Sequence, residues 1–369
     1  MENLNSFDKL IKLNKNIIIL IILIFTTSIF TLYSASGGSF SLWASKQFMY
    51  FLFFFPALFL ISIININFWA KLAYPLYFSA LILLIYVEFM GHTAMGATRW
   101  IRIAGISLQP SETMKIGLVL GLARYFSKKN IKEIKEIKNS IIPLAMIFTP
   151  ALLVLKQPDL GTAFILVAVG VGILFVVGVQ WWKFAICALL CISSLPIAWK
   201  YVLHDYQKKR VEVFLNPESD PLGSGYNITQ SKIAIGSGGF LGKGYLKGTQ
   251  SHLSFLPEKQ TDFIFTMFTE EIGFIGGFCL ITLYLIIAFF VFWIAFKSKY
   301  TYGRIVGSGM GFIIFFHVFV NIGMVMGILP VVGVPLPLMS YGGTITVSTL
   351  IAFGFILNAD LYKNEEIKS

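Results

Sequence analysis

Long runs of apolar residues, separated by short polar stretches, recur along the whole chain. Leu, Ile, Phe, Gly and Ser are mixed in these runs without strict alternation, which favours helices over the strands of a membrane β-barrel. A helix of about 20 residues, rising about 1.5 Å per residue, crosses a hydrocarbon core of about 30 Å. The pattern therefore predicts an all-α polytopic membrane protein with about ten transmembrane helices, at residues 16–33, 47–64, 72–90, 112–126, 140–156, 159–178, 182–200, 263–296, 304–329 and 338–358.

The polar stretch between the seventh and eighth runs, residues 201–262, is much longer than the others. We interpret residues 1–369 as a single integral membrane domain in which residues 201–262 form one large loop. Composition supports this interpretation, because 56% of the residues are hydrophobic and only 13% are charged. The first run could be mistaken for a signal peptide, but nine further runs follow it, so we expect it to stay as the first helix of the bundle.

Basic residues predict the orientation of these helices. An even number of spans places both termini on one side, and the short connections on that side carry most of the basic residues: Lys9, Lys12, Lys15, Lys71, Arg124, Lys128, Lys129, Lys132, Lys135, Lys138, Lys183, Lys297, Lys299, Arg304, Lys363 and Lys368. The positive-inside rule makes that side cytoplasmic, so we expect both termini in the cytoplasm and the 201–262 loop outside it. Attraction to anionic lipids then explains the net charge of +11, and nucleic acid is not an expected partner.

A second set of ionisable residues lies near the opposite, outer side. A charge inside an apolar span costs about 2.5–3.5 kcal/mol or more unless it is paired or faces water. One polar cavity that opens to the outside would explain the whole set: Arg99, Arg102, Glu112, Lys115, Lys156, Asp159, Arg210, Glu258, Asp262, Glu270 and Glu271.

Several of these residues also have an ordinary structural interpretation. Asp159 follows a proline at a turn and could cap a helix. Glu112 and Lys115 are three residues apart on one helix face and could form an ion pair. Arg99 and Arg102 flank a tryptophan, which is typical of an interfacial anchor.

The acids near the eighth run have similar alternatives. Thr261 could cap a helix with Asp262 in its first turn, and Glu270 and Glu271 could be first-turn acids of a helix that starts later. The residue pattern leaves these alternatives open. The histidines are scattered without metal-ligand spacing, and we interpret them as ordinary polar or core residues: His92, His204, His252 and His317.

Six sequence blocks carry a resemblance to a known family. They read GATRWIRIAGISLQPSE, KQPDLGTA, HDYQKKRV, NPESDPLGSGYNITQSKIAIGSGG, GKGYLKGTQSHLSFLPEKQTDFIFTMFTEEIGFIGG and NIGMVMGILPVVGVPLPLMSYGGT. Over about residues 30–357 the chain resembles the SEDS proteins of bacterial cell-wall synthesis, and the long GKGYLKGTQSHLSFLPE block favours the elongation branch of that family over the division branch. The family fold has ten transmembrane helices with a large extracytoplasmic loop between the seventh and eighth, which agrees with the spans predicted above.

The resemblance implies a peptidoglycan glycosyltransferase that polymerises lipid II in the bacterial cytoplasmic (inner) membrane. It implies that Asp262, in the motif Thr261-Asp262-Phe263, is the catalytic base, since a carboxylate in hydrogen-bond reach can take a proton from the attacking sugar hydroxyl. Inversion at the anomeric carbon, from α to β, requires no enzyme nucleophile. The implied partners are lipid II, the nascent glycan, membrane lipids, a class B penicillin-binding protein as transpeptidase and other proteins of the elongation complex.

The leaving pyrophosphate needs positive charge or a metal ion to stabilise it. The candidates for this task are the cations of the family blocks: Arg99, Arg102, Lys115 and Arg210. Asp159 would orient one of these cations or help to hold a divalent cation, and Glu258 is a further substrate-binding candidate. Whether a metal ion is required stays open.

Two alternative functions also stay open, a flippase for lipid II and a scaffold whose outer loop binds other wall-building proteins. A flippase needs charges through the depth of the membrane, whereas these ionisable residues gather toward one face. For the lipid chain, glycines in the sixth span and the segment GILPVVGVPLP would permit close helix contacts and irregular backbone that could line a groove: Gly170, Gly172 and Gly178. Packing alone explains these glycines equally well.

Overall fold

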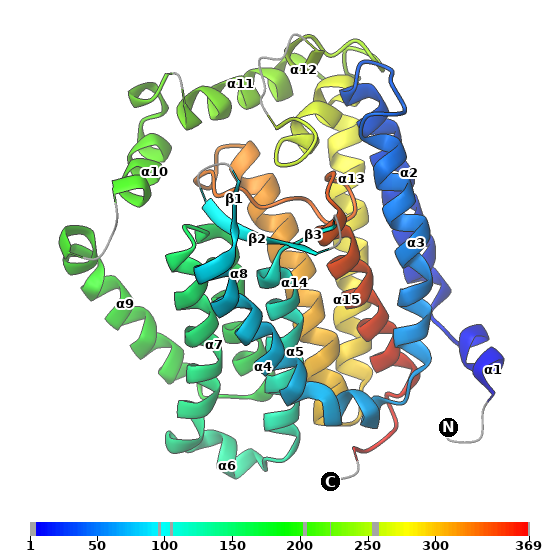
Figure 1. The fold of residues 1–369 in the computed structure, drawn as a ribbon, viewed down its shortest axis with the longest axis vertical. Helices are drawn as coiled ribbons and strands as arrows, with labels where there is room; N and C mark the ends of the chain where they lie inside the picture. Colours follow the sequence, from blue (N-terminus) through cyan, green and yellow to red (C-terminus); the bar gives the residue numbers. More distant parts are fainter. Residues whose placement is uncertain are drawn as a thin grey trace.

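The computed structural model describes residues 5–367 apart from 95–96, 104–105, 202–204, 222 and 253–257. Long helices lie side by side in one bundle, and both termini lie at the same end of it (Figure 1). The elements are α1 (Ser6–Ile11), α2 (Lys15–Ala35), α3 (Ala44–Ile63), α4 (Ile66–Met90), β1 (His92–Ala94), β2 (Ala97–Ile103), β3 (Ile106–Leu108), α5 (Pro110–Ser127), α6 (Ile131–Lys135), α7 (Lys138–Lys156), α8 (Leu160–Val177), α9 (Trp181–Tyr201), α10 (Asp205–Leu215), the 3₁₀ turn η1 (Pro217–Ser219), α11 (Ser224–Ser237), α12 (Thr249–His252), α13 (Ile264–Lys297), α14 (Thr301–Val325) and α15 (Gly343–Leu361).

Each apolar run predicted from the sequence forms a helix: α2, α3, α4, α5, α7, α8, α9, α13, α14 and α15. In the described part of the chain, 8 of these helices are long and apolar enough to span a membrane. The other two are α5, which carries Glu112, Lys115 and Arg124, and α9, whose apolar stretch Trp181–Ser194 is shorter. The prediction of a helical polytopic membrane protein is confirmed.

Close helix packing surrounds α5, α14 and α15, and most residues of each of these helices are buried. Helix α4 packs along α5, α3 along α15 and α13 along α14. Gly117 on α5 lets α4 approach, because a Cβ there would lie 3.2 Å from the Tyr77 Cα. Of the glycines predicted to allow close contacts, Gly170 and Gly172 do so: a Cβ would lie 2.5 Å from the Ile147 side chain at the first and 2.8 Å from Phe312 at the second.

The third of these glycines has another role. Gly178 has φ of +91° at the C-terminal cap of α8, and a Cβ there would meet nothing within 4 Å. Glycine adopts this left-handed conformation without strain, so it commonly ends a helix. Gly178 therefore terminates α8 and does not line a groove between helices.

Between α14 and α15 the chain forms an irregular segment, residues 326–342, which includes three prolines. Proline has no N–H and breaks helices. The runs predicted at 304–329 and 338–358 are corrected accordingly, because α14 ends at Val325 and α15 begins at Gly343. The irregular backbone expected in GILPVVGVPLP is confirmed.

Buried side chains supply hydrogen bonds to this irregular segment. Tyr284 on α13 donates to the Pro337 carbonyl oxygen at 2.6 Å, and Ser28 on α2 donates to the Met339 carbonyl oxygen at 2.7 Å. Non-helical backbone at membrane depth is stable only where such partners replace water. The second half of the segment, residues 336–340, is therefore held in the bundle interior.

The sequence pattern missed the structure between the spans. The large loop contains α10, α11, α12 and η1 at the end of the bundle opposite the termini (Figure 1), and α11 packs on α13. The strands β1, β2 and β3 form an antiparallel sheet in that order, with Ile101 opposite Leu108. The β-branched and aromatic residues of Thr-Arg-Trp-Ile-Arg-Ile, residues 98–103, were a signal for a strand.

Helix α13 is interrupted at Gly273, where φ is 81° and ψ is −170°. The acids just before the break join neighbouring segments: Glu270 accepts hydrogen bonds from Lys243 Nζ at 2.8 Å and from the Gln250 N–H at 2.9 Å. Glu271 accepts one from Ser34 Oγ on α2 at 2.5 Å. The interpretation of these two acids as first-turn residues of a late helix is wrong, because α13 starts at Ile264.

Candidate active site

Asp262 lies at the end of the large loop, immediately before α13. The residue at the N-terminal cap of α13 is Phe263, and its side chain makes no capping hydrogen bond. The Thr261 hydroxyl bonds instead to Glu258, to its carbonyl oxygen at 3.2 Å and to Oε2 at 3.1 Å. The capping interpretation of Thr261 and Asp262 is therefore wrong, and starting the helix does not explain the Asp262 carboxylate.

The turn that carries Asp262 is held against the irregular segment. Asn321 Nδ2 donates to the Asp262 carbonyl oxygen at 2.9 Å, and Ser340 Oγ donates to the Thr261 carbonyl oxygen at 2.6 Å. The Asp262 carboxylate faces the backbone of Gly333, which has φ of +70°, since a Cβ on that glycine would lie 3.3 Å from Oδ2. A glycine is therefore needed beside this carboxylate.

Four of the charged residues predicted for the site act electrostatically on Asp262. Burial raises its pKa from 3.8 to about 6, and the negative charges of Glu258 and Asp159 add to the rise. The positive charges of Arg210 and Arg99 oppose it. A carboxyl group whose pKa lies near neutrality, among mixed charges, has the property expected of a general base.

Asp159 and Arg99 form one unit beside Asp262. Asp159 caps α8, because its Oδ1 accepts the Thr162 N–H at 3.2 Å, so the capping interpretation is confirmed. Its other oxygen lies 3.9 Å from Arg99 Nη1, and Arg99 Nε donates to the Gln157 carbonyl oxygen at 3.1 Å. The Arg99 guanidinium thus folds onto the turn between α7 and α8.

Lys115 belongs to a separate buried cluster. Its Nζ lies 2.7 Å from Glu112 Oε1 and 2.5 Å from His317 Nε2, and Ser348 Oγ donates to Glu112 Oε2 at 2.7 Å. The ion-pair interpretation of Glu112 and Lys115 is confirmed. The sequence analysis did not predict His317 as a partner of Lys115. A charged residue within an apolar helix needs a polar partner on a neighbouring helix, and this requirement could have indicated the histidine.

Fewer contacts are available for the remaining predicted residues, Arg210, Arg102 and Glu258. Arg210 lies on α10, and its charge reaches Asp262 as described above. Arg102 lies on β2, but its side chain is outside the described part of the molecule. Glu258 adopts φ of 53° and accepts hydrogen bonds from Thr261 and, at 3.3 Å, from Gln260 Nε2. It supports the Asp262 turn directly.

Among the described residues, no group of three or more histidine, cysteine, aspartate or glutamate side chains could hold a metal ion. The described residues therefore do not form a dedicated protein metal site. Asp159 and Asp262 are near enough to affect each other electrostatically, but both Asp159 oxygens already accept hydrogen bonds from Thr162.

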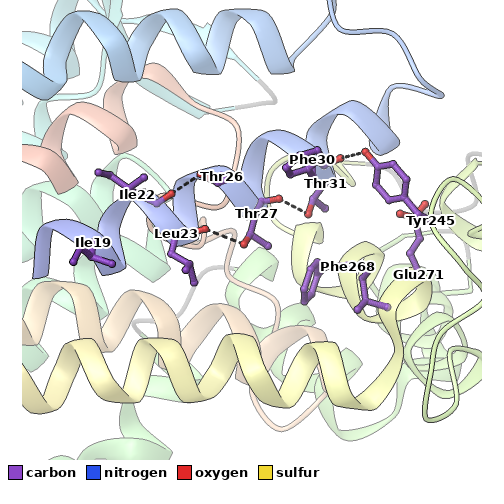
Figure 2. Close-up of a pocket in the computed structure, with 11 residues that line it drawn as sticks. Ile19, Ile22, Leu23, Thr26, Thr27, Phe30, Thr31, Tyr245, Phe268 and Glu271 are labelled. Atoms are coloured by element: carbon purple, nitrogen blue, oxygen red, sulfur yellow. Dashed lines mark hydrogen bonds between the residues drawn. The ribbon is translucent and has the colours of Figure 1, made fainter. Parts of the chain in front are cut away.

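A large apolar groove lies elsewhere, between α2 and the start of α13 (Figure 2). Its volume is about 730 Å³. The hydroxyls of Thr26, Thr27 and Thr31 donate to backbone carbonyl oxygens of α2 itself, so they present few free polar atoms to the groove. Glu271 and Tyr245 mark its polar end. Glu271 belongs to the ionisable set that was predicted to share one cavity, but neither Asp262 nor the substrate-binding candidates line this groove.

The chain is similar to known proteins over most of its length. It is 46% identical over 294 residues to the peptidoglycan glycosyltransferase MrdB of Escherichia coli K12, which covers 80% of this chain and 79% of that protein. It is 41% identical over 320 residues to the MrdB protein of Helicobacter pylori 26695, covering 85% and 82% of the two chains.

Solved structures share the fold. A chain from a peptidoglycan synthase complex that coordinates polymerization and crosslinking matches 96% of this chain and 99% of its own length, with a TM-score of 0.85 and 28% identity. The rod shape determining protein RodA of Thermus thermophilus matches 97% of this chain and 99% of its own, with a TM-score of 0.72 and 25% identity. The family model FTSW_RODA_SPOVE, described as cell cycle protein, matches residues 9–365. The chain therefore belongs to the FtsW/RodA/SpoVE family, which is the SEDS family, with MrdB and RodA proteins among its relatives.

Proposed function

We propose that this protein is a peptidoglycan glycosyltransferase that polymerises lipid II into glycan strands for cell-wall elongation. One observation carries the assignment of the site: the Asp262 carboxylate is not used to cap α13, has a pKa of about 6 and lies within electrostatic reach of Arg99 and Arg210. The curated names of the relatives favour a polymerase over a flippase or a scaffold.

In the proposed reaction, the GlcNAc 4-hydroxyl of one lipid II molecule attacks the anomeric carbon at the reducing end of the growing chain. The new C–O bond forms as the bond to the pyrophosphate breaks, and polyprenyl pyrophosphate leaves with the electron pair. Asp262 takes the proton of the hydroxyl, which a carboxylate can do at a distance of about 2.6–3.2 Å. Attack from the side opposite the pyrophosphate inverts the configuration.

Arg99 and Arg210 are the first candidates to stabilise the leaving pyrophosphate, because their charges already reach Asp262. Asp159 would hold Arg99 in place through their ion pair. Arg102, three residues after Arg99 on β2, also stays a candidate for contact with the pyrophosphate. Lys115 would act only if substrate drew it away from Glu112 and His317.

A divalent cation near the pyrophosphate stays part of the proposal. Mg²⁺ commonly binds through one or two carboxylates and the phosphate oxygens of a substrate. Such an ion would be held mainly by the substrate, because the described residues form no dedicated metal site. Loss of activity on adding EDTA, with recovery on adding Mg²⁺, would support it.

We propose that the protein lies in the bacterial cytoplasmic membrane with both termini in the cytoplasm and the 201–262 loop outside. Two features support this orientation: both termini lie at one end of the bundle (Figure 1), and the short connections at that end are rich in Lys and Arg. Asp262 would then face the outer leaflet, where the sugar of lipid II is polymerised.

A class B penicillin-binding protein is the proposed partner. A solved chain with the same fold belongs to a complex that coordinates polymerization and crosslinking, and a partner with transpeptidase activity would supply the second step. In mild detergent, such a protein should co-purify with this chain and raise its rate of glycan synthesis. Failure of both would count against the proposed partnership.

The test of the function uses purified protein with labelled lipid II in detergent, with glycan length measured on a gel. We expect long glycan strands from the natural protein and none from Asp262→Asn, because loss of a positioned base removes about a hundred- to ten-thousand-fold in rate. An inactive natural protein would argue against the polymerase. An Asp262→Asn variant that keeps more than about a tenth of the rate would move the base elsewhere, with Asp159 and Glu258 next to test.

A further inference from the structure

Two buried side chains hold consecutive carbonyl groups at Asp262. Asn321 on α14 donates from Nδ2 to the Asp262 carbonyl oxygen at 2.9 Å and to the Val334 carbonyl oxygen at 2.7 Å. Ser340 donates from Oγ to the Thr261 carbonyl oxygen at 2.6 Å. Both Asn321 and Ser340 are 0% exposed. They join the turn before α13 to α14 and to the irregular segment.

The chemistry of these contacts admits one arrangement. The two partners of Asn321 are carbonyl oxygens, which only accept, so its NH₂ group must face both of them. The Ser340 hydroxyl donates its single proton to Thr261 and uses a lone pair to accept the Leu336 N–H at 2.8 Å. Neither side chain has a spare donor for a ligand.

We propose that Asn321 and Ser340 are positioning residues that direct the Asp262 carboxylate at the attacking hydroxyl. The proposal rests on the function of Asp262 as base. Both side chains hold the backbone of the turn, and neither contacts the carboxylate in the described structure. The carboxylate lies over the backbone of Gly333, where the lack of a Cβ leaves space for it, and the backbone of the turn determines where the carboxylate begins.

Proton transfer to a carboxylate depends steeply on distance. A base must approach its hydroxyl within about 2.6–3.2 Å, and a displacement of about 1 Å can cost about a hundredfold in rate. No described side chain caps the start of α13, so helix geometry alone does not hold the turn. The contacts of Thr261 with Glu258 lie within the turn, whereas the hydrogen bonds from Asn321 and Ser340 fix it against the rest of the bundle.

The test compares Asn321→Leu and Ser340→Ala with the control Asn358→Leu. Asn358 is also a buried asparagine, 1% exposed, and its Nδ2 donates to the carbonyl oxygens of Ile61, Ser62 and Ile64. It lies near the end of α15 that leads to the C-terminus, so its loss should destabilise the fold without moving Asp262. Each full-length variant is purified, its thermal unfolding is measured, and kcat and KM for labelled lipid II are determined per folded molecule from pH 5 to 8.

We expect kcat to fall about tenfold or more in Asn321→Leu and Ser340→Ala, with KM changed less than about twofold, while Asn358→Leu keeps a normal kcat. The acidic limb of the rate should also move to lower pH in the first two variants, because a released carboxylate gains water. The double variant should be little worse than the worse single variant, since the two residues act on one turn.

A kcat and pH profile matching those of Asn358→Leu would overturn the proposal. If Asn321→Leu does not fold, Ser340→Ala decides by the same criteria. The natural protein is measured beside the variants: if it makes no glycan, the proposed function fails, whereas an active natural protein with normal variants refutes only the positioning role.

Discussion

At the scale of single residues, the environment of Asp262 raises its pKa and so makes it a better proton acceptor. The same environment makes the ionised carboxylate less stable in the folded protein. Burial and the neighbouring acids Glu258 and Asp159 raise its pKa to about 6, against the opposing charges of Arg210 and Arg99. Near neutral pH the carboxylate is mostly ionised, yet basic enough to take a proton. The same burial makes the ionised form costly to fold.

The rate of glycan synthesis should therefore depend on pH with an acidic limb near pH 6. The base must be ionised, so activity should be half-maximal near its pKa of about 6 and fall about tenfold for each further pH unit. Values of kcat/KM for lipid II from pH 5 to 8, which report the pKa of the free enzyme, would show this limb. A rate that stayed constant down to pH 5 would contradict the assignment of Asp262 as base.

Asp262→Asn should stabilise the protein at neutral pH while it abolishes activity. Because the folded-state pKa is raised above the unfolded value of 3.8, Asp262 costs no stability at about pH 3 or below, where it is neutral in both states. The cost grows as pH rises through the two pKa values and is complete above about pH 7. We expect the variant to gain up to about 3 kcal/mol at pH 7.5 and almost nothing at pH 3, as measured by thermal unfolding in detergent. An equal gain at both pH values would indicate another cause.

Arg210→Ala should lower the rate of polymerisation far more than Lys132→Ala. Loss of a charge-assisted contact to the pyrophosphate costs about 1.5–3 kcal/mol, or about ten- to more than a hundredfold in rate. Lys132 is an exposed residue of α6, which lies at the end of the bundle opposite the large loop (Figure 1). It serves as the control for the loss of a positive charge. Equal rates in the two variants would remove Arg210 from the site.

At the scale of helices, polar clusters explain how charged residues remain inside apolar elements. Helix α5 carries Glu112 and Lys115, and both are buried because each is the other's partner, with His317 on α14 and Ser348 on α15 completing the set. Such a cluster links three helices at one level. It also explains why α5 is less apolar than the other spans.

Removing one partner of this pair should destabilise the protein strongly. Lys115→Met leaves a buried carboxylate unpaired, so we expect a loss of about 3–5 kcal/mol in unfolding free energy. The double variant Glu112→Gln with Lys115→Met should recover most of that loss, because no charge stays unpaired. Thermal unfolding checks both, and equal stability of the single and double variants would contradict the coupling. Glycan synthesis by the folded double variant would remove Lys115 from the pyrophosphate candidates.

At the scale of the whole molecule, the two ends of the bundle should face different compartments. In a background without native cysteines, Thr229→Cys on α11 should react with a membrane-impermeant thiol reagent in intact spheroplasts. Lys132→Cys on α6 should react only after lysis, because it lies on the proposed cytoplasmic side. Labelling of the two in the opposite order would reverse the proposed orientation.

The sequence by itself determined the class of the fold and nearly all its spans. Apolar runs long enough for a bilayer have few alternatives to helix, because each backbone polar group must find a partner within the segment. Charged residues in so apolar a chain are also conspicuous. Arg99, Asp159, Arg210 and Glu258 could therefore be selected before the structure showed that their charges act on Asp262. Their roles in catalysis stay predictions.

The tertiary structure decided which polar residue contacts which. The sequence did not show whether Thr261 caps a helix or bonds to Glu258, nor whether Lys115 faces the site or its ion pair. These choices depend on packing against segments far apart in the chain, such as Ser340 at Thr261 and His317 at Lys115. Asn321 and Ser340 show the same limit, since an isolated polar residue in an apolar run does not name its partner. The physical reason is that hydrogen bonds and ion pairs act over a few ångströms in space, whereas the sequence orders residues only along the chain.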